Sequence, residues 1–506
     1  MMNWTHGRRV RQVVQALFFG LYIYLLIAAL QRRATLPLAD LFFRLDPLAA
    51  GGAMLAGRRW IGRLALALIT LALTLTLGRV WCGWVCPLGT LLDWARFRKR
   101  VEDRRPLSGR WRSVKYVLLL VILSAALFGN LTLMVLDPIT LMTRTMTASV
   151  LPALNHGITA VERVLYRVPL TKGGVVWVEA LLRGKVLPVQ QPVYGGNIII
   201  LVLFGAIIGL NAVTHRFWCR YLCPLGALLG LLSKVAFLRP MIGRSCNRCA
   251  ECVGTCGMDA IHTEPDGFRI SPSECIVCVD CLAACPRSGA GFEWVRPPAA
   301  QQPYDPSRRQ ALASLVGGAV GTAVLATGAH TRDGDPLLVR PPGVADEREF
   351  LSLCLRCSQC IKVCPTGGLQ PVLLEAGLEG IWTPRLVPRL GYCDYGCHAC
   401  TQICPSGAIP DISLALKRQV VMGVAVIDRN RCLPWAHGTP CIVCEEMCPQ
   451  PEKAIRVEEV TVVDARGNEM TVQQPHVLED LCIGCGICEY QCPVQGQAAI
   501  RVYRRV

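Results

Sequence analysis

The chain has 506 residues, of which 52% are hydrophobic, and its formal net charge at pH 7 is +17. This length allows three or more domains. The mean hydropathy of +0.38 is high for a soluble protein and favours a chain with membrane-spanning segments. A strongly basic chain can bind nucleic acid, but the sequence carries no nucleic-acid-binding motif, so no nucleic-acid partner is expected.

Five apolar segments are each close to the ~20 residues that a helix needs to cross the hydrocarbon core of a bilayer. They cover residues 13–30, 62–80, 116–136, 197–214 and 311–329. Arg63, at the start of the second segment, could extend to the headgroups. The sequence therefore predicts a membrane α-helical bundle of four spans, with a fifth span that links it to the rest of the chain.

Basic residues are distributed unevenly around these segments. Residues 81–115 carry nine lysines and arginines, whereas the longer stretch 137–197 carries six. Because cytoplasmic loops are enriched in Lys and Arg, we expect the N-terminus and residues 81–115 in the cytoplasm, and the protein in the inner membrane. Five arginines within residues 31–61, on the expected outer side, weaken this signal.

An internal repeat relates two halves of residues 1–240. The segments Trp81–Leu92 and Trp218–Leu229 resemble each other, and each holds a C-x3-C-P motif. In each half, a Leu-Asp-Pro sequence follows the first predicted helix, at Asp46 and Asp137. We therefore expect two related helix hairpins whose cysteine pairs reach the same cytoplasmic face. These cysteines are Cys82, Cys86, Cys219 and Cys223.

The other 24 of the 28 cysteines form six runs of four. Three thiolates separated by two residues can wrap three irons of a four-iron cube, and the fourth, followed by proline, usually ligates a neighbouring cube. Proline follows the fourth cysteine in five runs, and Gly257 follows it in the sixth. Disulfides and zinc sites require other arrangements of cysteines. The sequence therefore predicts six [4Fe–4S] clusters.

Four of the runs are close to the bacterial ferredoxin pattern C-x2-C-x2-C-x3-C: Cys246/Cys249/Cys252/Cys256, Cys275/Cys278/Cys281/Cys285, Cys354/Cys357/Cys360/Cys364 and Cys482/Cys485/Cys488/Cys492. Two runs are variants with a longer first spacing: Cys393/Cys397/Cys400/Cys404 and Cys432/Cys441/Cys444/Cys448. An oxidised cluster with four thiolates carries about −2, so six clusters would remove about 12 units of the formal positive charge.

The two C-x3-C-P pairs are open to three interpretations. Pro87 and Pro224 fit the first position of a short helix, whose partial positive charge favours a thiolate at the preceding cysteine. The four cysteines bind a seventh cluster between the hairpins, or form redox-active dithiols, or are structural. No haem is predicted, because His215 is the only histidine near a span and no C-x2-C-H motif is present. No flavin is predicted either.

The remaining sequence divides into three parts. Residues 241–296 form a two-cluster ferredoxin, which we expect in the cytoplasm because it directly follows the fourth span. Residues 297–334 contain a Pro-rich linker, Arg308 and Arg309, and the fifth span. Residues 335–506 form a four-cluster polyferredoxin, which we expect in the periplasm. Cleavage after Ala329 would release this last part.

The pair Arg308 and Arg309 before an apolar stretch is close to a twin-arginine export signal, although Ala311 stands where a large apolar residue is usual. The alternative is two solvated arginines before an ordinary anchor or a buried helix. Both ferredoxin blocks are expected to be α+β modules. Short apolar pieces after the runs should form strands that pack over the clusters: Ala260–Ile261, Ala408–Ile409, Ala454–Ile455 and Ala499–Ile500.

These motifs resemble those of two known families. Residues 1–300 resemble the membrane ferredoxin of the NapH/MauN type, with four spans, two C-x3-C-P motifs and a two-cluster domain. Residues 305–506 resemble its exported partner of the NapG/MauM type, with two arginines before an apolar segment and Arg340-Pro341-Pro342-Gly343 before the first of four runs. The chain looks like a fusion of the two.

The resemblance implies a quinol dehydrogenase-type electron-transfer subunit, with quinone as substrate, that passes electrons to a periplasmic reductase or c-type cytochrome. The alternative is an accessory electron donor for maturation or reactivation of a periplasmic metalloenzyme. Asp46 and Asp137, at the outward ends of the first helices, are candidate proton acceptors of a quinol site. An Asp-Pro turn or helix cap is the plainer interpretation of both.

Overall fold

The computed structural model describes residues 4–505 apart from 31–37, 96–108, 185, 189–191, 244, 266, 288, 295–311, 314–315, 322, 324–334 and 464–468. Arg308, Arg309, Ala329 and most of the basic loop after residue 95 lie outside these described residues. Contacts between residues divide the chain into two compact units. The first contains Met1–Leu26, Leu38–Thr145 and Ile198–Val324, and the second contains Ile27–Pro37, Met146–Asn197 and Leu325–Val506.

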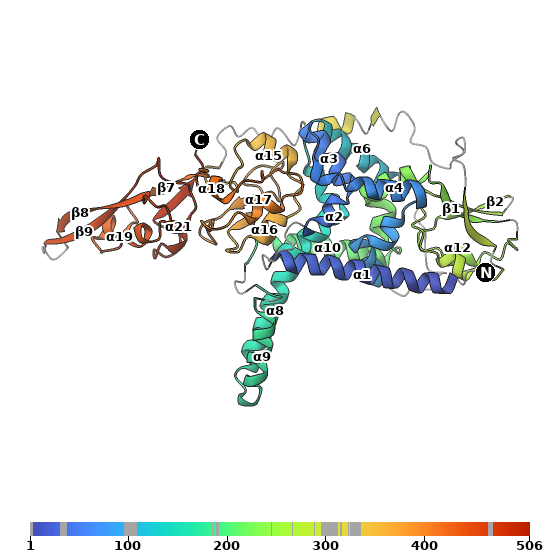
Figure 1. Cartoon of the computed structure of the whole chain (residues 1–506), viewed down its shortest axis with the longest axis horizontal. Helices are drawn as coiled ribbons and strands as arrows, with labels where there is room; N and C mark the ends of the chain where they lie inside the picture. Colours follow the sequence, from blue (N-terminus) through green and yellow to red (C-terminus); the bar gives the residue numbers. More distant parts are fainter. Residues whose placement is uncertain are drawn as a thin grey trace. The chain divides into compact units, whose positions relative to one another are not determined.

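Helix α1 (Trp4–Leu30), the long blue helix of Figure 1, is the one helix in the described part of the chain that is long and apolar enough to cross a membrane. The helices at the other predicted spans are shorter than expected. The helix predicted over 62–80 ends at Leu77, before Gly78 with φ +78°, and the one predicted over 116–136 ends at Leu127, before Gly129 with φ +80°. Glycines with positive φ commonly end helices.

The apolar part is built from many short elements. Its helices after α1 are α2 (Leu41–Arg44), α3 (Pro47–Gly57), α4 (Ala67–Leu77), α5 (Pro87–Trp94), α6 (Val114–Leu127), α7 (Pro138–Thr145), α10 (Asn197–Gly209) and α11 (Pro224–Ser233). The π-helical turns η3 (Trp81–Val85) and η10 (Trp218–Leu222) contain the first cysteine of each C-x3-C-P pair. Short 3-10 turns are η2 (Gly62–Leu64), η5 (Gly109–Ser113), η6 (Thr132–Leu136) and η9 (Leu210–Ala212).

The internal repeat predicted from the sequence is present as matching elements. Helices α3 and α7 each begin at the proline of a Leu-Asp-Pro sequence. Helices α5 and α11 each begin at the proline after the second cysteine of a pair, directly after a π-helical turn. Proline is favoured there because its missing N–H would have no partner in the first helical turn. The helix starts predicted at Pro87 and Pro224 are therefore confirmed.

Part of the fifth predicted span is described, and residues 312–313, 316–321 and 323 are helical. Gly318 is buried against α6, where a β-carbon on Gly318 would lie 2.6 Å from the Cβ of Ser124. Close contacts between small residues are typical of helices that pack against each other within membranes.

The first ferredoxin module has an α+β fold. Strand β1 (Leu238–Ile242) pairs antiparallel with β4 (Ala290–Trp294), and β2 (Ile261–Glu264) pairs antiparallel with β3 (Gly267–Ile270). Short helices α12 (Glu251–Thr255) and α13 (Asp280–Ala284) each follow a cysteine loop. The side chains of Ile261, Ile270 and Leu282 form a buried core with the cysteines.

The second unit contains a helical hairpin and the C-terminal modules. The hairpin consists of η7 (Met146–Val150), α8 (Leu151–Leu165), η8 (Pro169–Thr171) and α9 (Lys172–Leu182), and Figure 1 labels both of its helices. The helices of the modules are α15 (Glu347–Leu353), α16 (Gln359–Val363), α17 (Ala399–Ile403), α18 (Leu414–Lys417), α19 (Leu433–His437), α20 (Val443–Glu446) and α21 (Ile487–Gln491).

Three antiparallel strand pairs complete these modules. They are β5 (Leu369–Pro371) with β6 (Pro384–Leu386), β7 (Val424–Ile427) with β10 (Ile500–Tyr503), and β8 (Ile455–Val463) with β9 (Glu469–Val477). Ile261, Ile455 and Ile500 begin strands as predicted, but the strand expected at Ala408–Ile409 is not formed. Ile409 instead donates its N–H to the Sγ of Cys404 at 3.4 Å, so this segment folds over a thiol.

Candidate functional site

The four C-x2-C-x2-C runs share an unusual backbone conformation. The second and fourth residues after the first cysteine all have φ between +55° and +79°: Arg248, Ala250, Val277, Val279, Arg356, Ser358, Gly484 and Gly486. This conformation costs a non-glycine residue on the order of 1–3 kcal/mol. It directs backbone N–H groups toward sulfur, and Val277 donates to the Sγ of Cys275 at 3.4 Å. Successive N–H groups that face one point form a site for an anion.

Three cavities are each lined by four cysteines, three from one run and the fourth from another. Site II has Cys275, Cys278, Cys281 and Cys256. Site IV has Cys393, Cys397, Cys400 and Cys364. Site V has Cys432, Cys441, Cys444 and Cys492. The exchange of the fourth cysteine between neighbouring runs, expected from bacterial ferredoxins, is therefore seen at these three sites.

The same exchange organises the other two sites of the second unit. Burial raises the pKa of Cys357, and the nearby Cys404 thiolate raises it further. Burial also raises the pKa of Cys485 to about 12, and Cys448 is among the thiols that add to this shift. Ser406, two residues after Cys404, donates its hydroxyl to the carbonyl of Leu353 at 2.6 Å, and Gln450, two residues after Cys448, donates to the carbonyl of Leu481 at 3.2 Å. We therefore assign Cys404 to site III with Cys354, Cys357 and Cys360, and Cys448 to site VI with Cys482, Cys485 and Cys488.

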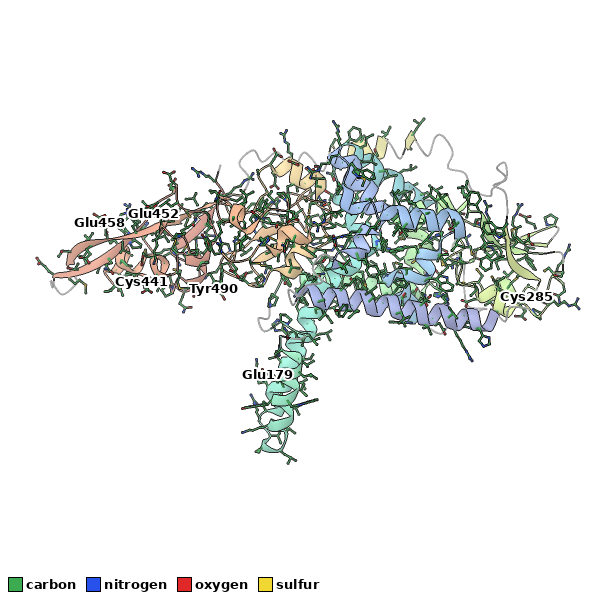
Figure 2. All side chains as sticks on the ribbon, viewed as in Figure 1. Glu179, Cys285, Cys441, Glu452, Glu458 and Tyr490 are labelled. Atoms are coloured by element: carbon green, nitrogen blue, oxygen red, sulfur yellow. The ribbon has the colours of Figure 1, made fainter. Side chains whose placement is uncertain are left out.

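Cys285 completes the remaining site of the first module, and it is labelled in Figure 2. Gly289 donates its N–H to the Sγ of Cys285 at 3.2 Å. Gly289 also lies against the other run, because a β-carbon there would be 3.2 Å from the N of Cys246. Site I thus has Cys246, Cys249, Cys252 and Cys285.

The sites of the second unit form a series. Sites III and IV are neighbours because they exchange their fourth cysteines, and sites V and VI are neighbours for the same reason. Cys393 of site IV donates its N–H to the carbonyl of Cys485 in site VI at 2.8 Å. The order is therefore III, IV, VI, V. Cys441 of site V, labelled in Figure 2, lines a cavity with Pro475 of strand β9.

The four cysteines of the C-x3-C-P pairs come together in the first unit, and we name them site VII: Cys82, Cys86, Cys219 and Cys223. All four are buried and interact electrostatically with one another. Helix α11 directs an N–H toward them, because Gly226 donates to the Sγ of Cys223 at 3.2 Å. Each of the seven sites offers four thiols, the donor set that a [4Fe–4S] cluster requires.

Within the described residues, no three His, Cys, Asp or Glu side chains converge closely enough to hold a single metal ion. Two buried arginines at site VII were missed by the sequence interpretation, although the repeat contains the signal that identifies them. Arg79 and Arg216 each stand three residues before the first cysteine of their pair, and their side chains are 0% and 1% exposed.

Site II of the ferredoxin module lies against site VII. Trp84 donates its Nε1–H to the carbonyl of Val277 at 2.9 Å. A β-carbon on Gly83 would lie 2.1 Å from the carbonyl oxygen of Ile276, so only glycine fits at this position. Ile276 and Val277 belong to the cysteine loop of site II, whereas Gly83 and Trp84 lie between the two cysteines of the first C-x3-C-P pair.

The structure brings Asp46 and Asp137 together, and both are 0% exposed. Each caps a helix: Asp46 Oδ1 accepts from the N–H of Leu48 at 2.8 Å, and Asp137 Oδ2 accepts from the N–H of Thr140 at 2.8 Å. The capping role proposed as the plainer interpretation is therefore confirmed. The side chains of Asp46 and Asp137 also lie close enough to interact electrostatically with each other.

Contacts along helix α1 show the order in which these sites lie along the helix. Arg11 contacts the ferredoxin module, Gln15 donates to the carbonyl of Gly83 at 2.9 Å, and the hydroxyl of Tyr22 lies 3.1 Å from that of Thr143 in α7. With a rise of ~1.5 Å per residue, Gln15 and Tyr22 lie about 6 and 16 Å beyond Arg11. The order along α1 is the ferredoxin module, site VII, and then helix α7, whose first residue directly follows Asp137.

These features define an iron–sulfur protein in which ferredoxin modules are joined to an apolar helical domain. Two family models, both described as a 4Fe-4S binding domain, match the chain. One matches residues 60–105 and 197–245, which include both C-x3-C-P motifs, and the other matches residues 475–495. No solved structure matches the chain.

Similar proteins cover different parts of the chain. The methylamine utilization ferredoxin-type protein MauM of Methylorubrum extorquens is 37% identical over 216 residues, which are 40% of this chain and 92% of MauM. The ferredoxin-type protein NapG of Escherichia coli is 35% identical over 191 residues, 36% of this chain and 78% of NapG. The ferredoxin-type protein NapH of Escherichia coli is 26% identical over 259 residues, 50% of this chain and 73% of NapH.

The chain therefore belongs to the MauM/NapG family of ferredoxin-type proteins, and it joins a NapH-type part to a NapG/MauM-type part. This fusion was predicted from the sequence. The protein carries multiple [4Fe–4S] clusters and transfers electrons through them.

Proposed function

We propose that this protein takes electrons from membrane quinol and passes them to a periplasmic reductase or c-type cytochrome. The observation that carries the proposal is the arrangement of the cysteine sites in series: site II lies against site VII in the first unit, and sites III, IV, VI and V follow one another in the second. A bound [4Fe–4S] cluster accepts and donates one electron at a time. A series of such sites serves transport of electrons.

Sites I to VI would each hold one cluster through the four thiolates assigned to them. We propose that site VII holds a seventh. This assignment is favoured over separate dithiols because the thiols of both halves of the repeat are buried and interact with one another. The match of a 4Fe-4S binding family model to both C-x3-C-P segments supports it as well.

We propose that the two ferredoxin blocks face opposite sides of the membrane. Residues 81–115, the basic loop expected in the cytoplasm, contact the first module through Trp84 and through the ion pair of Lys115 with Glu274. Residues 146–197, expected outside, contact the C-terminal modules instead: Gly195 donates its N–H to Gln370 Oε1 at 3.2 Å. The first module thus contacts residues 81–115 within the first unit, and the C-terminal modules contact residues 146–197 within the second unit.

Reporter fusions test this sidedness. Alkaline phosphatase joined after Val506 should be active, because it would be exported with the C-terminal modules. The same enzyme joined after Pro298 should be inactive. An inactive enzyme at both positions, or activity only after Pro298, would contradict the topology and the periplasmic partner.

We propose that Asp46 and Asp137 accept protons at the quinol site. Oδ2 of Asp46 and Oδ1 of Asp137 are buried, and neither has a hydrogen-bond donor among the described residues. Two carboxyl groups in contact cannot both stay ionised in such a place, so the pair holds one shared proton. Oxidation of a quinol to a quinone releases two electrons and two protons, and the pair offers a place for one of these protons.

The variants Asp46→Asn and Asp137→Asn test this role. Each should slow the reduction of the protein by a lipid-soluble quinol by a factor of about 10² or more, a typical contribution of general base catalysis. Asp40→Asn is a matched control, because Asp40 is equally buried in the same segment but is paired with Arg44. Unchanged rates in both Asp46 and Asp137 variants would leave helix capping as their only role.

The same assay separates the accessory function from quinol oxidation. A protein that donates electrons only during maturation of a metalloenzyme should show no turnover with quinol and an acceptor in isolation. Deletion of the gene for such a protein should instead leave the partner metalloenzyme without its cofactor.

A further inference from the structure

Arg79 and Arg216 occupy equivalent positions in the repeat, and each side chain reaches across to the opposite half. A β-carbon on Gly226 in the second half would lie 2.8 Å from Arg79 Nη2. Arg216 Nη1 donates to the carbonyl of Cys82 in the first half at 2.9 Å. Both guanidinium groups therefore lie beside site VII, and each interacts with cysteines of both halves.

The charge of Arg216 is balanced within the protein. Its Nε and Nη2 donate to the two oxygens of Asp93 at 2.8 and 2.7 Å, so the pair is bidentate. Although burial alone would raise the pKa of Asp93, Arg216 holds that pKa well below its ordinary value. All three donor nitrogens of Arg216 thus have partners.

Arg79 is balanced less completely. Its Nη1 donates to the carbonyl of Ser273 at 2.7 Å and lies 4.0 Å from Glu274. Glu274 is already bound by Lys115, with Nζ 2.8 and 2.6 Å from its two oxygens. Nε and Nη2 of Arg79 are buried and have no hydrogen-bond partner among the described residues.

Arg79 also lies between two cluster sites. It interacts electrostatically with Cys82 and Cys223 of site VII, and with Cys275 of site II. Ser273 and Glu274, which contact its guanidinium, directly precede Cys275 in the chain. Arg79 is thus a buried cation with unused hydrogen-bond donors next to two sets of thiolates. Such a cation can stabilise an anionic group bound at either site.

We propose that Arg79 is a charge-balancing residue shared by sites II and VII, and that its Nη2 donates a hydrogen bond to the anionic iron–sulfur cluster of site VII. The inference rests on the proposed assignment of a cluster to site VII. Reduction adds a negative charge to a cluster, and a nearby buried cation favours the reduced state. Arg79 should therefore raise the reduction potentials at both sites, whereas Arg216 should act at site VII alone.

Redox titration of the purified full-length protein, followed by electron paramagnetic resonance, tests the proposal. The signals of sites VII and II are first identified by their loss in Cys223→Ser and Cys275→Ser. Arg79→Gln should then lower the midpoint potentials of both signals, and Arg216→Gln should lower that of site VII only. Arg79→Lys keeps the charge and should hold the site II potential close to the wild-type value.

Iron content of each variant shows whether the clusters are bound. Unshifted potentials in an iron-replete Arg79→Gln protein would overturn the inference, as would a shift at one site alone. If Arg79→Gln fails to fold, Arg79→Lys becomes the test. A site II potential in Arg79→Lys that lies well below the wild-type value, although the positive charge is kept, would overturn the inference as well. Both predicted shifts in a protein that fails to oxidise quinol would support the inference while contradicting the proposed function.

Discussion

Single residues decide how the cysteine sites are assembled. Val277 and Val279 are β-branched residues held at φ +55° and +59°, a conformation that such side chains rarely adopt. This strain persists because the loop turns its N–H groups toward the thiols of site II. The cysteine spacing predicts which residues are ligands, but only the folded loops show which run supplies the fourth thiol at each site.

Exchange of the fourth cysteine can be tested at sites III and IV. Cys404 belongs by sequence to the run of Cys393, but the structure assigns it to site III with Cys354. Cys404→Ser should therefore alter the same spectral signal as Cys354→Ser, measured by electron paramagnetic resonance on the reduced protein. A change in the signal affected by Cys393→Ser instead would contradict the assignment.

Gly83 allows the ferredoxin loop to approach site VII. In Gly83→Ala the new methyl group would overlap the carbonyl of Ile276, so we expect the protein to lose about 1–3 kcal/mol of stability. Denaturant unfolding followed by the visible absorbance of the clusters measures this loss. Gly51→Ala is the control, because a β-carbon at Gly51 meets no atom within 4 Å in helix α3. Equal stability of the two variants would contradict the close contact.

At the scale of elements, the helical domain is made of short helices that begin at Asp-Pro and Cys-Pro sequences. Hydropathy predicts where these helices lie but not where they break, because Gly78 and Gly129 end them inside apolar stretches. The repeat predicts that Asp46 and Asp137 are equivalent. Their contact could not be predicted, because it depends on how α3 and α7 pack. The equivalent positions of Arg79 and Arg216 in the repeat indicate that the two arginines have the same role at site VII.

Helix α6 is joined to the ferredoxin module by the buried pair of Lys115 and Glu274. Glu274→Gln would leave two buried cations, Lys115 and Arg79, without their carboxylate, so we expect a loss of about 3–5 kcal/mol in the free energy of unfolding. Glu264→Gln removes an exposed pair with Arg269 and should cost less than about 1 kcal/mol. Denaturant unfolding of both variants at neutral pH measures the difference.

The effect of Glu274 should also depend on pH. Burial acts to raise the pKa of Glu274, but Lys115 and Arg79 together hold it below its ordinary value. The pair therefore contributes its full stability between the ordinary pKa of glutamate and the pKa of Lys115, and loses it as the pH falls through the lower folded-state value of Glu274. The difference between wild type and Glu274→Gln should shrink in that acidic range, and again above about pH 8, because burial lowers the pKa of Lys115 to about 8. A difference that is already lost near neutral pH would contradict the ion pair.

At the scale of the whole molecule, the chain combines seven cysteine sites with an apolar helical domain. With every site filled by a four-iron cluster, anaerobically purified protein should contain about 28 iron atoms and as many acid-labile sulfides. The double variant Cys82→Ser/Cys219→Ser should lower this to about 24 and leave sites I to VI filled. Iron near eight atoms per chain, without evidence of cluster loss, would contradict the assignment of six ferredoxin-type sites.

The central claim is that electrons enter from quinol in the bilayer and leave from the C-terminal modules. The most direct measurement uses the purified protein in lipid vesicles that contain quinol, with a membrane-impermeant one-electron acceptor added on the side of the C-terminal modules. The acceptor should be reduced only when both quinol and the protein are present, and the Asp46→Asn and Asp137→Asn variants should slow its reduction. A protein whose clusters are reduced by dithionite but never by quinol would contradict the account.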